Sequence, residues 1–112
     1  MKNLNYLNKN RVEFIGMMGD EYNGFFIINI KGEEYNVMAS NGHGWDHVSV
    51  SHKYKIPSWK VMCIIKDMFF EEDETVIQFH PKKSEYVNIH PNCLHLWRKH
   101  GKEHELPPKY MI

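Results

Sequence analysis

The sequence PSWKVMCIIKDMFF at residues 57–70 decides the fold, because its periodicity predicts the clearest element of the chain. Apolar residues recur in it at spacings of three and four, which is the pattern of an amphipathic helix. The repeating apolar positions are Trp59, Met62, Ile65 and Phe69. Proline followed by serine is typical of a helix start, and the acidic run at residues 71–74 is unfavourable at a helix C-terminus. We therefore expect a helix that ends near Phe70.

Short β-prone runs precede this helix. Residues 12–18 and 25–30 are two such runs, and the turn-forming residues between them predict a hairpin. Residues 31–33 (KGE) signal a tight turn, and two sets of residues alternate over residues 35–40: Tyr35, Val37 and Ala39 on one face, and Asn36, Met38 and Ser40 on the other. The sequence therefore predicts a three-stranded meander.

Residues 40–44 (SNGHG) are rich in Gly and Asn, so we expect a loop rather than a strand there. Residues 45–52 then alternate with a period of two, which predicts a strand with two different faces. One face carries Val48 and Val50. The other face is polar apart from one indole and carries Trp45, His47, Ser49 and Ser51.

The segment after the helix is also predicted to be extended. Residues 75–80 predict a strand that Pro81 ends, since proline has no N–H for a sheet. Residues 86–89 form a short extended piece, and a turn at residues 90–92 leads into residues 93–97. The prediction is an α+β fold, in which one main α-helix packs across a mostly antiparallel β-sheet.

Length and composition fit one domain over residues 1–112, with an N-terminal arm at residues 1–10 and a C-terminal tail at residues 99–112. Fourteen Lys and Arg balance fourteen Asp and Glu, which argues against binding to long nucleic acid. No apolar run is long enough to span a bilayer, and the first residues do not resemble a signal peptide. We expect a cytoplasmic protein without membrane contact, whose cysteines Cys63 and Cys93 are both reduced.

Catalytic signatures are weak in this sequence. It has no dinucleotide or P-loop glycine pattern, no Gly-x-Ser-x-Gly elbow and no paired Cys-x-x-Cys spacing. We therefore predict no catalytic residues, no metal and no cofactor. The alternative is a metal-dependent hydrolase of nucleotides or nucleic acid. Its ligands would be His47, His80, His90 and His95.

The remaining polar and aromatic residues suit the binding of a nucleotide without conversion, since aromatic rings stack on bases and amides and imidazoles contact base edges. The candidate ligand-binding residues are Trp45, His47, Phe79, Tyr86, Asn88, Asn92, His95 and Arg98. We expect the guanidinium of Arg98 to be free to reach a phosphate. In the alternative, Arg98 pairs with an acid such as Glu103 or Glu105 and contributes little.

A set of motifs gives the chain a resemblance to short phage and prophage proteins. The motifs are WDHVSVS at residues 45–51, PSW at 57–59, VIQFHP at 76–81, YVN at 86–88 and HPNCLHLWR at 90–98. They cover about half of the chain. Among phage families, the chain most resembles the first type of Thoeris anti-defence protein, which sequesters immune signals made by bacteria.

The resemblance implies a non-enzymatic sponge in the cytoplasm of an infected bacterium. Such a protein binds cyclic ADP-ribose isomers and, in some members, cyclic oligonucleotides, and it leaves them intact. The resemblance also implies a homodimer or higher homo-oligomer with pockets near the subunit contacts. A third interpretation is a phage protein that binds a host protein through an exposed sheet face.

Overall fold

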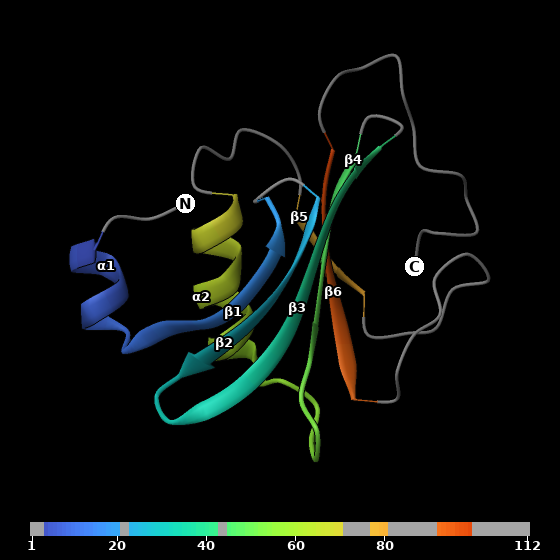
Figure 1. Ribbon diagram of the computed structural model, residues 1–112. Helices are drawn as coiled ribbons and strands as arrows, with labels where there is room; N and C mark the ends of the chain where they lie inside the picture. The colour runs from blue at the N-terminus through green and yellow to red at the C-terminus, as the bar shows by residue number, and fades with distance from the viewer. Residues whose placement is uncertain (1–3, 21–22, 43–44, 71–76, 81–91, 100–112) are drawn as a thin grey trace.

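The computed structural model describes residues 4–20, 23–42, 45–70, 77–80 and 92–99. Six strands in this part of the chain form one antiparallel sheet in the order β1-β2-β3-β4-β6-β5 (Figure 1). The strands are β1 (Val12–Gly19), β2 (Gly24–Ile30), β3 (Glu33–Gly42), β4 (Trp45–Ser51), β5 (Ile77–His80) and β6 (Cys93–Lys99). The helices are α1 (Leu4–Lys9) and α2 (Trp59–Phe69). The predicted α+β class with a mostly antiparallel sheet is therefore confirmed.

Strands β1, β2 and β3 form the predicted meander. The turn between β2 and β3 contains Lys31 and Gly32, which have φ angles of 53° and 90°. Two successive positive φ angles are typical of the type I′ turn, whose twist matches that of a hairpin. The side chain of Asn29 accepts a hydrogen bond of 2.9 Å from the N–H of Gly32. The KGE signal therefore predicted this turn correctly.

Strand β3 is longer than the sequence predicts. Ser40, Asn41 and Gly42 pair with His47, Asp46 and Trp45 of β4, so the expected loop over residues 40–44 is wrong for its first three residues. Gly and Asn lower the intrinsic preference for a strand, but the ladder of hydrogen bonds to β4 outweighs that small effect. This extension places Ser40 beside His47.

Helix α2 and one face of the sheet share the hydrophobic core. Its residues Met62, Ile64, Ile65 and Met68 are buried in the same cluster as Phe26, Ile28, Tyr35, Val37, Val48, Val50 and Leu96 of the strands. Ser58 caps the helix, because its side chain accepts a hydrogen bond from the N–H of Val61. The helix ends at Phe69, as the acidic run predicts. Figure 1 shows α2 on one side of the sheet, and the ring of Phe69 in α2 packs edge-on against Phe26 of β2.

The N-terminal arm contains a short helix. Tyr6 and Leu7 of this helix, α1, pack against the core. The phenol of Tyr6 donates a hydrogen bond of 3.2 Å to the carboxylate of Asp67 on α2. Burial first, and then this carboxylate, raise the pKa of Tyr6 to about 12. The arm is therefore anchored on α2.

Where they are described, the last two strands agree with the strands that the sequence predicts. Strand β5 covers the end of the predicted strand at residues 75–80, and β6 extends two residues beyond the predicted 93–97. The predicted extended piece at residues 86–89 and most of the predicted tail lie outside the described residues. Neither helix in the described part of the chain is long and apolar enough to cross a membrane.

Candidate ligand-binding face

Strands β4 and β6 present different side chains on their two faces. Val48 and Val50 are buried in the core that contains α2, while His47 and Ser49 alternate with them and are only partly buried. The β4–β6 register pairs His47 with Trp97 and Ser49 with His95. We call the sheet face opposite α2 the His47 face. It carries Asn36, Ser40, His47, Ser51, His95 and Trp97.

A cluster of rings lies at the centre of the His47 face. The Nε2 atom of His47 lies 2.7 Å from the Nδ1 atom of His95, which is hydrogen-bonding distance. The imidazole of His47 also stacks on the indole of Trp97, with 4.1 Å between ring centroids and 22° between planes. The Oγ atom of Ser40 lies 3.5 Å from the second nitrogen, Nδ1, of His47. Three side chains, from β3 and β6, thus contact the ring of His47 and hold it in one orientation.

Two rings of this cluster are more deeply buried than side chains on an ordinary protein surface. His95 is 1% exposed and Trp97 is 7% exposed, yet neither belongs to the hydrophobic core around α2. A hydrogen bond between two imidazoles needs one N–H donor and one nitrogen lone pair. The pair therefore carries a shared proton, and buried histidines that share a proton are typical of functional sites as well as of satisfied cores.

A polar hollow lies at the other end of the same face. It has a volume of about 250 Å³ and is lined by Glu34, Asn36, Ser51, His52 and Lys53. The lining supplies a carboxylate, an amide, a hydroxyl, an imidazole and an ammonium group. These groups offer both donors and acceptors to a polar ligand.

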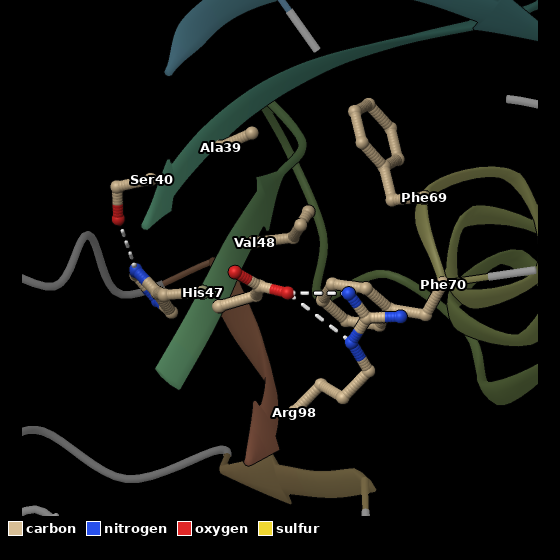
Figure 2. A pocket seen from close by; sticks show the side chains of 8 residues that line it. Ala39, Ser40, His47, Val48, Phe69, Phe70 and Arg98 are labelled. Atoms are coloured by element: carbon tan, nitrogen blue, oxygen red, sulfur yellow. Dashed lines mark hydrogen bonds and ion pairs between the residues drawn. The ribbon is translucent and has the colours of Figure 1, made fainter. Parts of the chain in front are cut away.

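Arg98 lies on the opposite face, toward α2. Its Nη2 and Nε atoms donate hydrogen bonds of 2.5 Å and 3.2 Å to the same carboxylate oxygen, Oδ2, of Asp46. The guanidinium also lies over the ring of Phe70, 4.9 Å from its centroid. Figure 2 shows Arg98 on one side of β4 and His47 with Ser40 on the other. The prediction of a guanidinium free to reach a phosphate is therefore wrong, because a nearby carboxylate and an aromatic ring already occupy it.

The cavity next to this ion pair is small. It lies between the end of α2 and the strands, has a volume of about 20 Å³, and includes Ala39, Phe69, Phe70 and Arg98 in its lining (Figure 2). That volume admits one or two water molecules. Ser40 and His47 also line this cavity, but a nucleotide does not fit in it. The polar hollow of about 250 Å³ on the His47 face is larger, so this face is the candidate site.

The structure brings together only part of the predicted site. His47 and His95 are in contact, whereas Asn92 is the residue just before β6 and donates a hydrogen bond of 3.3 Å to the carbonyl oxygen of Lys53. Trp45 and Phe79 lie in β4 and β5, but their side chains are outside the described residues, as are Tyr86 and Asn88 entirely.

The sequence analysis missed Ser40 and Trp97 as neighbours of His47. Trp97 and His95 are two residues apart, so the period-two alternation of a strand over residues 93–99 predicts that they lie on the same face. Ser40 closes the alternating run of residues 35–40 and also opens the Gly- and Asn-rich segment 40–44, so the sequence places it on the polar face of a strand but does not show that His47 lies beside it. Among the described residues, no group of three or more His, Cys, Asp or Glu side chains is placed to hold a metal.

A family model described as a domain of unknown function (DUF7694) matches residues 37–101, which is more than half of the chain. The matched segment begins in β3 and includes α2, the histidine pair and the Asp46–Arg98 ion pair. No curated protein and no solved structure matches the chain.

Proposed function

Since the chain belongs to the DUF7694 family, whose description states no function, we propose a function from the chemistry of its side chains. The protein binds a small cyclic nucleotide, of the cyclic ADP-ribose class, on the His47 face and releases it unchanged. It acts as a sponge that withholds an immune signal from its effector, in keeping with the phage proteins that the sequence resembles. In this proposal α2 lies across the other face and serves only the core.

The stacked rings carry this proposal. An imidazole that stacks on an indole and hydrogen-bonds to a second imidazole combines an aromatic surface with polar atoms, which is what a nucleobase needs from a protein. Base–aromatic stacking contributes about 1–3 kcal/mol for each base. Of the three rings, His47 alone is partly exposed, so it is the ring that a ligand reaches first.

The polar hollow favours a ligand that carries a second polar group some distance from its base. His47 and Ser51 are four residues apart on β4, which corresponds to about 13 Å along a strand. A base near His47 therefore leaves a ribose or phosphate within reach of the hollow. Lys53 in the hollow supplies a positive charge for a phosphate, and Asn36 and Ser51 supply hydrogen bonds.

One observation favours a hydrolase as the second candidate. Ser40, His47 and His95 form a chain of polar contacts, of 3.5 Å and 2.7 Å, in the order of a nucleophile, a base and a group that orients the base. Such an enzyme would return a linear product, whereas a sponge returns the cyclic compound.

We also propose that the protein is a homodimer or a higher homo-oligomer. Strand β1 is at one edge of the sheet and exposes Ile15, Met17 and Met18, which are 54%, 60% and 73% exposed. An apolar edge strand can pair with a second copy of itself. Light scattering should give at least twice the monomer mass, and Met17→Lys should lower it. A monomer at working concentration would contradict this part of the proposal.

The sponge proposal is tested by incubating the protein with a mixture of cyclic nucleotides and ADP-ribose isomers. After removal of unbound compounds, heat denaturation should release a cyclic species of unchanged mass, which mass spectrometry identifies. His47→Ala should retain less of it than the wild-type protein. Steady formation of a linear product would favour the hydrolase, and the absence of both a retained compound and a linear product would overturn both.

A further inference from the structure

We propose that Arg11, Lys31 and Lys60 form a binding site for a small diphosphate anion at one end of the sheet, separate from the His47 face. The backbone brings the first two residues together, because the N–H of Lys31 donates a hydrogen bond of 3.0 Å to the carbonyl oxygen of Arg11. Arg11 lies between α1 and β1, and Lys31 lies in the turn between β2 and β3 (Figure 1). We call the three side chains the basic corner.

Lys60, in the first turn of α2, supplies the third positive charge of the basic corner. Its ammonium group is in contact with the side chain of Lys31. This contact, then desolvation, and then the charges of Lys60 and Arg11 lower the pKa of Lys31. All three residues are exposed, so an anion in the solvent can reach them. None of the three forms an ion pair with a carboxylate in the part of the chain that the structure describes.

The backbone conformation of Arg11 and Lys31 is unusual for basic residues. Both have left-handed φ angles, of 52° and 53°. Arg11 follows the end of α1, and its N–H donates a hydrogen bond of 3.1 Å to the carbonyl oxygen of Asn8, at a position that favours Gly or Asn. Lys31 occupies the first central position of the type I′ turn, which favours Asn. A basic residue at each position therefore adds backbone strain that Gly or Asn would avoid.

The basic corner thus gathers positive charge where local preferences oppose it. Lys60 adds to this, since a cation in the first turn of a helix opposes the helix dipole. The three like charges also repel one another. A bound anion would offset this repulsion for all three side chains at once.

A diphosphate matches the donors of the basic corner. A guanidinium binds two phosphate oxygens in parallel, whereas an ammonium group binds as a point charge. A diphosphate carries oxygens on two phosphorus atoms and so offers acceptors to all three side chains. Long nucleic acid fits less well, because it needs contacts along many phosphates and the chain has no net positive charge. This site does not depend on nucleotide binding by the His47 face.

The test is a calorimetric titration of the full-length protein with sodium pyrophosphate at neutral pH and low ionic strength. The wild-type protein should bind one anion per chain, and added sodium chloride should weaken the binding. Lys31→Asn and Arg11→Asn should each weaken it about fivefold or more. Both variants should nevertheless melt at a higher temperature than the wild type without the anion, because Asn suits the left-handed positions and the repulsion is reduced.

Two lysines outside the basic corner serve as controls. Lys66 is also on α2, but its ammonium group lies 3.3 Å from the carboxylate of Asp67. Lys53 lines the polar hollow of the His47 face. Lys66→Gln and Lys53→Gln each remove one positive charge and should bind pyrophosphate as the wild type does.

Four results would overturn the proposal. The first is the absence of saturable pyrophosphate binding by the wild type, and the second is an unchanged affinity in Lys31→Asn. The third is a loss of affinity in Lys66→Gln or Lys53→Gln as large as that in Lys31→Asn, which would indicate a general charge effect or binding in the polar hollow. The fourth is tighter binding of a short DNA duplex than of pyrophosphate at equal phosphate concentration.

Discussion

Replacement of Arg98 by methionine should destabilise the protein without affecting ligand binding. The guanidinium donates two hydrogen bonds to one oxygen of Asp46 and lies over the ring of Phe70. It therefore joins β6 to β4 and to the residue that follows α2. Methionine keeps much of the side-chain volume but removes the charge, so Asp46 would remain as a buried carboxylate without this partner.

The size of the effect follows from burial. The side chains of Arg98 and Asp46 are 23% and 12% exposed. Removal of one partner from a fully buried pair costs about 3–5 kcal/mol, whereas an exposed pair contributes about 0–1 kcal/mol. For this partly buried pair we expect a loss of about 2–3 kcal/mol, of which the contact with Phe70 accounts for about 0.5–1 kcal/mol. The melting temperature should fall by about 10 °C.

The assay is urea unfolding of the wild-type protein, Arg98→Met, Asp46→Asn and the double variant. The double-mutant cycle isolates the coupling between the two side chains, and we expect about 2 kcal/mol for it. Arg98→Lys should recover only part of the loss, because an ammonium group does not donate in the geometry of a guanidinium. A loss below about 0.5 kcal/mol for Arg98→Met would refute the reasoning, since that is the range of a solvated surface pair.

Three further predictions concern other parts of the fold. Ser58→Ala removes the cap of α2 and should lower the free energy of unfolding in urea by about 1 kcal/mol. The pKa of Tyr6 is raised to about 12 by burial and by Asp67, so its stabilising contribution is complete below about pH 10 and is lost as the pH rises toward 12. An ultraviolet absorbance titration should show one fewer late-titrating phenol in Tyr6→Phe. Burial raises the pKa of the Cys93 thiol, so iodoacetamide should modify it more slowly than the half-buried Cys63; equal rates by peptide mass spectrometry would contradict this.

Periodicity predicted the parts of the fold that local sequence controls. The buried positions Met62 and Ile65 of α2, the KGE turn and the alternation in β4 each involve residues within one element, so their spacing shows in the sequence. Trp59 was placed on the same apolar stripe, but this prediction is wrong, because Trp59 lies in the first turn of α2 and is 65% exposed. The extension of β3 to Gly42 was not predictable in the same way, because it depends on pairing with β4 rather than on the preferences of Ser, Asn and Gly.

In the candidate site, too, the sequence predicted what depends on one strand but not what depends on the pairing of distant strands. The alternation in residues 45–51 correctly separates His47 from Val48, but a single strand does not reveal which strands lie beside it. The neighbour of β4 is β6, more than forty residues later, and this pairing brings His95 to His47 and Arg98 to Asp46. The sequence predicted Arg98 as a phosphate ligand because it does not reveal that Asp46 lies beside Arg98 in the fold.

The most direct measurement is calorimetric titration of a cyclic ADP-ribose isomer into three proteins: the wild type, His47→Ala and Arg98→Met. The wild type should bind the compound, His47→Ala should bind it at least tenfold more weakly, and Arg98→Met should keep its affinity within about twofold. Arg98→Met remains folded, since the expected loss of about 2–3 kcal/mol is smaller than the stability of a typical domain. Absence of binding by the wild type, or loss of binding in Arg98→Met with full affinity in His47→Ala, would contradict a ligand site on the His47 face.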